Sequence, residues 1–356
     1  MSSVLKFTDV PEDQTPEQYA KELDKKKQAA QQEDLKKQQA ELEEMTKNSK
    51  GGTEQMLERL KKSIDPELLD KFQIVCSRVR WVDPDKKTVL WCHDLAGDPE
   101  AAHLRDKNSR DRFAGIVCVS DWQMQQYNAY LGLPYSESMV IHNAIEPVEI
   151  EEKQFGEQVR LIYHTTPHRG LELVIPVFMK LYEKYGNKIH LDVYSSFSIY
   201  GWNQRDEQYK PLFDQCEKHE GITYHGYKPR EEVIEALKKA HIFAFPSIWP
   251  ETSCLSAIEA LSAKVSIVCP NFAALPETTR PFSYMYQFSE DKTEHGNRFG
   301  YVLSGLIDRY LDESKRSEIV GNLNAQKKFI DSIYNWDTRA TQWTEYLKDL
   351  LASKGS

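Results

Sequence analysis

The sequence predicts an α/β protein with two doubly wound parallel-sheet domains that face a cleft, preceded by a charged arm. Two observations predict this fold. Short apolar runs alternate with helical stretches from about residue 72 onwards, which is typical of parallel sheets. The 356 residues also exceed the size of a single hydrophobic core, so two domains are expected.

The composition narrows the class of function. Hydrophobic residues make up 40% of the chain, enough for substantial cores, and the net charge of −9 argues against a nucleic-acid partner held by its phosphates. No apolar run has the length of a membrane span, and no signal peptide is evident. The six scattered cysteines form no CxxC pair, which favours free thiols over zinc. We expect a cytoplasmic protein, in the host cytoplasm if the chain is viral.

Residues 1–49 do not look like part of a globular domain. The run from Glu17 to Lys47 is almost entirely helix-forming, with lysines and acidic residues close to balance and no sustained heptad. It is predicted to be a charged, solvated helix or a partly disordered arm. Docking to another protein and self-association both stay open for it.

Residues 50–148 are predicted to form a shortened Rossmann-like domain. The pair Gly51 and Gly52 precedes a helical run, and such a loop lets the backbone approach a ligand while the helix start favours phosphate. His93 ends one strand, where ligand-facing residues are expected. The four expected strands cover residues 72–79, 88–94, 115–121 and 138–145.

An acidic linker is expected at residues 149–158, followed by a second Rossmann-like domain over 159–333 and a final amphipathic helix within 334–356. The second domain opens with a strand, the loop HTTPHRG and a helix. Arg169 in this loop stands at the start of that helix.

The stretch FPSIWPETSCLSAIEA holds two carboxylates, Glu251 and Glu259. An apolar strand at residues 241–245 leads into it, and Thr252 and Ser253 are candidate caps of the helix that follows. A strand, a loop with one carboxylate and a helix with the other could present both to a crevice at the strand ends. Alternatively, Glu251 is solvated and Glu259 lies on a helix face.

These motifs, in this order, resemble GT-B glycosyltransferases, in particular the large retaining family numbered four, also called glycosyl transferases group 1. The resemblance rests on RLIYHTTPHRGLELVIPVFMKL, ITYHGYKPREEVIEALKKAHIFAFPS and ETSCLSAIE, and on the loop NFAALPE. It spans roughly Lys50 to Leu351 and is strongest from Arg160 to Glu277. The segments KGGTE, LLDKFQIVCSRVR and YHTTPHRGLELVIPVF are also similar to short glycosyltransferase-like proteins of tailed phages.

The resemblance implies transfer of a sugar, with retention of configuration and without a metal, from a nucleotide-diphosphate donor. UDP or GDP is the expected nucleotide, no other cofactor is implied, and the acceptor is a glycan, a protein or a small molecule. The N-terminal domain, residues 50–148, would be the acceptor side, and the final helix is expected to cross back to it.

The resemblance also assigns catalytic roles to His93, Arg169 and Glu251. His93 would contact the transferred sugar, Arg169 would stabilise the leaving diphosphate, and Glu251 would hold sugar hydroxyls. Glu259 would accept hydrogen bonds from the ribose. The remaining donor-binding residues would be Gly51, Gly52, His164, Thr165, Gly226, Tyr227, Ser253 and Cys254.

The chain departs from the family pattern at several of these positions. His164 replaces the usual arginine, which weakens a phosphate contact or makes it pH-dependent. Thr252 and Ser253 replace a glycine and a phenylalanine, so the choice of sugar is not implied. A helical arm stands where the family has a first strand.

Other functions stay open. The same fold serves nucleotide-sugar epimerases and hydrolases, which would need no acceptor. The short N-terminal domain and His164 also suit a non-catalytic scaffold or virion-associated protein. A Rossmann-type oxidoreductase is disfavoured because no GxGxxG follows a first strand.

Overall fold

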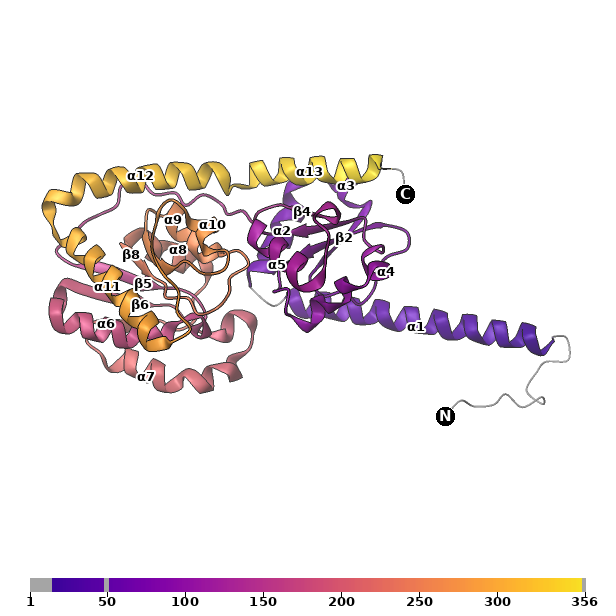
Figure 1. Ribbon diagram of the computed structural model, residues 1–356, viewed down its shortest axis with the longest axis horizontal. Helices are drawn as coiled ribbons and strands as arrows, with labels where there is room; N and C mark the ends of the chain where they lie inside the picture. The colour runs from indigo at the N-terminus through magenta and orange to yellow at the C-terminus, as the bar shows by residue number, and fades with distance from the viewer. Residues whose placement is uncertain (1–14, 48–50, 354–356) are drawn as a thin grey trace.

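The computed structural model of the chain describes residues 15–47 and 51–353. Two α/β domains lie side by side, α12 and α13 run along one side of both, and α1 projects away from the N-terminal domain (Figure 1). The predicted fold class is confirmed: both domains are built on parallel sheets.

The N-terminal sheet has four parallel strands in sequence order, β1-β2-β3-β4. Every residue of β3 is buried, as are all but the first of β2, which is why these strands appear as continuous apolar runs. β1 is shorter than predicted because Ser77 has a φ of 58° and turns the chain out of the strand. The strands are β1 (Phe72–Cys76), β2 (Lys87–Cys92), β3 (Gly115–Cys118) and β4 (Ser138–Val140).

Short helices cover this sheet. α5 follows β3 and is capped by Ser120, whose hydroxyl accepts a hydrogen bond from the N–H of Gln123. The helices are α2 (Gly52–Ser63), α3 (Pro66–Leu69), η2 (Pro99–Arg105), α4 (Lys107–Arg110), α5 (Asp121–Leu131) and η3 (Tyr135–Glu137).

The C-terminal sheet has six parallel strands in the order β10-β9-β8-β5-β6-β7. The strand order reverses between β5 and β8, so the crevice beyond their carboxyl ends is the topological switch point, where doubly wound folds bind ligands. The strands are β5 (Val159–Tyr163), β6 (Ile189–Val193), β7 (Ile222–Tyr224), β8 (Ile242–Ala244), β9 (Ser266–Pro270) and β10 (Ser283–Tyr286).

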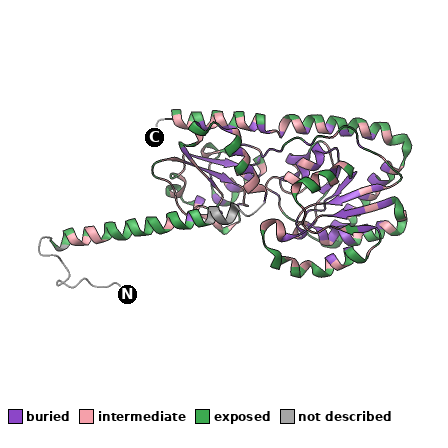
Figure 2. Ribbon diagram, turned by 180° about the vertical axis from the view of Figure 1, so that it is seen from behind, coloured by how far each residue is buried: buried purple, intermediate pink, exposed green. Residues whose placement is uncertain are grey.

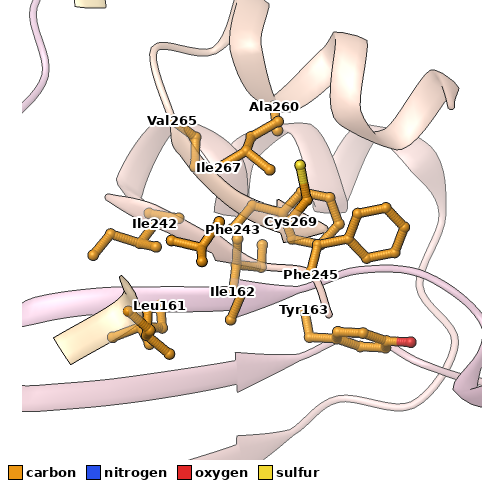
Figure 3. Close-up of a cluster of buried hydrophobic side chains, with 14 of the residues drawn as sticks. Leu161, Ile162, Tyr163, Ile242, Phe243, Phe245, Ala260, Val265, Ile267 and Cys269 are labelled. Atoms are coloured by element: carbon orange, nitrogen blue, oxygen red, sulfur yellow. The ribbon is translucent and has the colours of Figure 1, made fainter. Parts of the chain in front are cut away.

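The core of this domain surrounds the two central strands. Leu161 and Ile162 of β5 and Phe243 of β8 are completely buried, and Figure 3 shows them gathered with side chains of β9 and α9. Because helices cover both faces, the central strands are buried, whereas the edge strands β7 and β10 are partly exposed and the outer helix faces are exposed (Figure 2). The strand predicted at residues 241–245 is thus confirmed with narrower bounds.

The helices of the C-terminal domain follow its strands in the alternation that the sequence predicts. They are η4 (Pro167–Arg169), α6 (Leu171–Tyr185), η5 (Gly186–Lys188), η6 (Phe197–Tyr200), η7 (Asn203–Tyr209), α7 (Lys210–Lys218), α8 (Arg230–Lys239), α9 (Leu255–Ser262), α10 (Leu275–Thr279), α11 (Lys292–Leu311), η8 (Glu313–Lys315) and α12 (Arg316–Ile333).

The last helix, α13 (Trp336–Ala352), packs on the N-terminal domain. Trp343 and Leu347 belong to the same buried cluster as Met56 and Leu60 of α2. The indole of Trp343 also lies 4.9 Å from that of Trp91 in an edge-to-face arrangement, which is favourable for aromatic rings. Residues far apart in the sequence therefore share one core.

The arm forms a helix, α1 (Pro16–Lys47), which docks through its C-terminal part. The Oε1 atom of Gln39 accepts hydrogen bonds from the N–H groups of Arg80 at 2.8 Å and Trp81 at 3.3 Å. Both ends of the predicted arm, at residues 1–14 and 48–49, lie outside the described residues, as does residue 50. None of the helices in the described part of the chain combines the length and apolarity that crossing a membrane requires.

Candidate functional site

Two loops meet at the switch point of the C-terminal sheet. One follows β5 and carries Arg169, and the other follows β8 and carries Glu251. Gly170 has a φ of +127°, and a Cβ there would collide with the carbonyl oxygen of Pro246, so only glycine allows this approach. The N–H of Ile248 donates to the carbonyl oxygen of Arg169 at 3.3 Å, which fixes the two loops together.

Arg169 and Glu251 form a buried ion pair. The Nη1 atom of Arg169 donates to Oε1 of Glu251, which is 4% exposed. Its Nε atom donates to the hydroxyl of Thr166 at 3.1 Å. Burial opposes the charge of Arg169, but the neighbouring carboxylate outweighs it and holds the pKa of the guanidinium above its ordinary value. Among the described residues, Nη2 has no hydrogen-bond partner and stays available to a ligand.

The N-terminus of α9 adds main-chain donors beside this pair. The helix begins at Leu255, and its N-cap is Cys254 without a side-chain bond. The prediction that Thr252 or Ser253 caps it is therefore wrong; Thr252 instead turns towards the other domain. Within the described chain, the N–H groups of Ser253 and Cys254 have no hydrogen-bond partner, as a site for oxygen ligands at a helix start requires.

Glu259 lies one helical turn further along α9. Its Oε1 atom accepts a hydrogen bond from Nε of Arg230, 2.7 Å away at the start of α8. Burial raises the pKa of Glu259 above its ordinary value although Arg230 opposes the shift. The two carboxylates thus pair with different cations, and neither is simply solvated. Gly226, with a φ of +63°, and Tyr227 form the turn that leads into α8.

His93 and His164 are half-buried residues whose Nε2 atoms are enclosed by the protein. Burial lowers the pKa of His164 and of His93 to about 3. The ring of His164 lies 4.3 Å from that of Phe243, and its Nε2 atom has no partner in the described part of the chain. His164 is therefore neutral near pH 7 and brings no positive charge to a phosphate. Thr165 beside it is half-buried.

The N-terminal domain meets the Glu251 loop directly. The hydroxyl of Thr252 donates to the carbonyl oxygen of His93 at 3.0 Å, and the hydroxyl of Ser120 donates to the carbonyl oxygen of Thr252 at 2.6 Å. A Cβ on Gly52 would lie 2.9 Å from the side chain of Leu255, at the start of α9. His93 and the glycine loop are therefore brought to the switch point.

A second contact joins the domains at the start of α5. The carboxylate of Glu277 accepts hydrogen bonds from the N–H groups of Asp121 and Trp122, both at 2.9 Å, and lies 2.8 Å from Nε2 of His142. Burial alone would raise the pKa of Glu277, but the bonds from His142 and the two N–H groups hold it below its ordinary value. Acidic groups at a helix start are favourable.

Sequence reasoning missed two residues that build this site. Arg230 and Tyr200 have no motif of their own, and their roles come from tertiary contacts. A Cβ on Gly51 would lie 2.7 Å from the ring of Tyr200, which places that ring against the glycine loop. The one clue in the sequence was Thr252, which replaces the glycine of the family pattern. A glycine there would have no side chain to bond the carbonyl oxygen of His93.

Comparison with known proteins gives a match to one family model and similarity to several solved structures. Residues 151–294 match the family model described as Glycosyl transferases group 1, and a comparison with curated proteins finds no match. A solved glycosyltransferase from Rickettsia africae ESF-5 is similar, with a TM-score of 0.62 and 13% identity over 84% of this chain and 82% of that one. HepE of Anabaena, solved with UDP-glucose, has a TM-score of 0.58 and 12% identity over 74% of this chain and 72% of its own. A variant of TarM from S. aureus has a TM-score of 0.57 and 14% identity over 82% of this chain and 58% of its own.

Proposed function

We propose that the chain, whose residues 151–294 match the Glycosyl transferases group 1 family model and whose fold is GT-B, transfers a sugar from a nucleotide-diphosphate sugar to an acceptor. The observation that carries the proposal is the Arg169–Glu251 pair at the switch point. It sets a cation and a carboxylate where the donor's diphosphate and sugar would meet.

Arg169 would stabilise the leaving diphosphate. Its Nη2 atom and the N–H groups at the start of α9 would donate to phosphate oxygens, and this interaction grows as negative charge develops. Glu251 holds the guanidinium in position and keeps its other oxygen for a sugar hydroxyl, together with the N–H groups of Ser253 and Cys254. Because Arg169 and the helix start neutralise the diphosphate, the reaction would need no metal.

Glu259 would bind the ribose. Its Oε2 atom has no partner among the described residues, so it can accept from a hydroxyl while Arg230 keeps Oε1. The base would lie against the turn at Gly226 and Tyr227. Complexes of HepE with UDP and UDP-glucose support UDP as the first nucleotide to test.

Retention of configuration would follow from attack on the same face of the sugar that the diphosphate leaves. His93, with its pKa of about 3, is a poor base near neutral pH, so a donor phosphate oxygen would take the acceptor proton. ¹H NMR of the first-formed product tests retention, and assays with and without EDTA test metal independence.

Calorimetry with UDP, GDP, ADP, TDP and CMP tests the donor site. We expect one diphosphate to bind wild type at micromolar concentration and to lose affinity in Glu259→Ala, while Glu290→Ala, an exposed change, keeps it. No binding of any nucleotide would overturn the proposal. Release of free sugar or of an epimer without acceptor would instead identify a hydrolase or an epimerase.

One observation favours a second candidate, a non-catalytic relative. Arg169 and Glu259 both already hold an internal partner of opposite charge, and His164 is neutral. Such a site can keep the fold without releasing its cation to a phosphate. Nucleotide binding without turnover of any nucleotide sugar would support a scaffold over the enzyme.

A further inference from the structure

The segment between β6 and α7 carries a series of aromatic side chains that none of the proposed donor contacts uses. With two residues of the neighbouring loops they form one continuous ridge, which we call the aromatic ridge. Its six members are Trp249, His168, Phe197, Arg205, Trp202 and Tyr200.

Each member of the aromatic ridge touches the next. The ring of Trp249 lies 4.9 Å from that of His168, which stacks on Phe197 at 5.2 Å. The guanidinium of Arg205 lies 5.9 Å from the centre of the Phe197 ring and 4.2 Å from that of Trp202. Trp202 is in turn 5.1 Å from Tyr200. Rings supported from both sides in this way form a firm surface.

Hydrogen bonds hold the ridge in shape. Asp206 accepts from the N–H of Phe197 at 2.8 Å, and the N–H of Trp202 donates to the carbonyl oxygen of Phe197 at 3.2 Å. Gly201, with a φ of +74°, makes the tight turn that sets Tyr200 and Trp202 side by side. The platform is therefore built in advance of any ligand.

Two members of the aromatic ridge, on either side of the buried Phe197, are open to solvent. Trp202 is 44% exposed and Trp249 is 40% exposed, although such rings are usually covered. Arg205 adds exposed hydrogen-bond donors beside the face of Trp202. The Nδ1 atom of His168 is buried and has no partner within the described chain, so a polar atom faces the ridge unsatisfied.

The ridge adjoins the proposed site of transfer. Trp249 precedes Glu251 by two residues, His168 precedes Arg169, and Tyr200 packs against Gly51. The proposed ribose and base side is elsewhere: Glu259 pairs with Arg230 at the start of α8, and Tyr227 lies in the turn before that helix. The ridge therefore begins beside the Arg169–Glu251 pair and includes the exposed side chains of Trp202 and Trp249.

We propose that the aromatic ridge binds a carbohydrate acceptor, with sugar rings stacked on Trp202 and Trp249. The apolar C–H face of a pyranose matches a flat indole, and its equatorial hydroxyls can accept hydrogen bonds from the exposed guanidinium of Arg205 at the ring edge. Of the acceptor classes open to this chain, the ridge selects a glycan over a protein or a small apolar molecule. This inference rests on the proposed function.

A glycan array probed with the full chain tests the inference. We compare labelled wild type, Trp202→Ala, Trp249→Ala and Tyr301→Ala, the last replacing an 83% exposed ring on α11 far along the sequence from the ridge. We expect wild type to bind at least one class of glycan, both tryptophan variants to lose the signal at least tenfold, and Tyr301→Ala to keep it.

Calorimetry with UDP on the same proteins separates the ridge from the donor site. Unchanged UDP affinity in Trp202→Ala together with lost glycan signal supports the inference. No glycan signal from wild type, or an undiminished signal in both tryptophan variants, overturns it, whatever the UDP result. Absent UDP binding with a retained, tryptophan-dependent glycan signal overturns the proposed function and leaves a carbohydrate-binding protein.

Discussion

The hydroxyl of Thr252 donates a hydrogen bond to the carbonyl oxygen of His93, and the two oxygens lie 3.0 Å apart across the boundary between the domains. Ser120 returns a bond of 2.6 Å to the carbonyl oxygen of Thr252. One residue of the Glu251 loop is thus held by the ends of two N-terminal strands. The position of the Glu251 loop is therefore tied to the closed contact between the two domains.

Thr252→Val should loosen this closure. The change removes one interdomain hydrogen bond at nearly constant volume, which costs about 0.5–1.5 kcal/mol. We expect a larger radius of gyration by small-angle X-ray scattering and a lower kcat with little change in nucleotide affinity. Thr293→Val, on the exposed start of α11, is the control. Identical scattering from the two variants would contradict the role given to Thr252.

Arg169→Ala should destabilise the fold, because it leaves Glu251 buried without its partner. Breaking a buried pair costs about 3–5 kcal/mol. The double variant Arg169→Ala/Glu251→Ala should cost less than the sum of the single changes, since neither charge is then stranded. Urea unfolding of the four proteins measures this coupling. Strict additivity would mean that the two side chains do not interact in solution.

Arg169 and Glu259 should differ in their effect on the reaction. Glu259→Ala removes hydrogen bonds from a charged acceptor and should weaken nucleotide binding by about 1–3 kcal/mol. Arg169→Ala should lower turnover more than Glu259→Ala does, because it acts on charge that develops in the transition state. Steady-state kinetics of both variants, with Glu290→Ala alongside, checks the order. Unchanged kinetics in Arg169→Ala would remove its assigned role.

Stability should fall as the pH drops below neutral. His93 and His164 keep a pKa of about 3 in the folded chain against an ordinary value of 6.5. Below pH 6.5 the unfolded chain therefore binds protons that the folded chain does not, and each histidine lowers the free energy of unfolding by about 1.4 kcal/mol per pH unit. Urea unfolding at pH 7.5, 6.5 and 5.5 measures this slope, and His164→Gln should reduce it. A stability that stays level down to pH 5.5 would show that these rings are not buried as described.

Glu277→Ala should open the domains from the other side. The change removes the acceptor of the Asp121 and Trp122 N–H groups and of His142, all in the N-terminal domain. We expect faster proteolysis of the linker and a larger radius of gyration. Glu277→Gln keeps acceptor capacity and should be milder; equal effects of both changes would argue that charge, rather than hydrogen bonding, holds this contact.

The fold class could be predicted because apolar runs that form buried strands can be recognised in a sequence without any knowledge of tertiary contacts. The apolar parts of the predicted runs, residues 88–92 and 115–118, are buried on both faces, so they predicted strands β2 and β3 directly. The ends of strands were less predictable. A polar residue such as Ser77 adopts a φ of 58° for reasons of tertiary structure, and no local pattern announces that turn.

The site was predictable only where function requires a fixed spacing. Glu251 and Glu259 stand out as a pair in the sequence, but their partners Arg169 and Arg230 come from other loops and were not paired with them in advance. The charge state of His164 was also beyond reach, because it depends on burial against Phe243. The sequence states which residue stands at a position, but its burial and its partners depend on tertiary structure.

The position of α13 has a consequence for the order in which the protein assembles. The N-terminal core includes Trp336, Trp343 and Leu347, which the ribosome adds after the whole C-terminal domain. The core of the N-terminal domain therefore stays incomplete, with its sheet partly uncovered, until α13 has been synthesised. During synthesis the second domain completes its core first, and the final helix then closes the half of the molecule that was made before it.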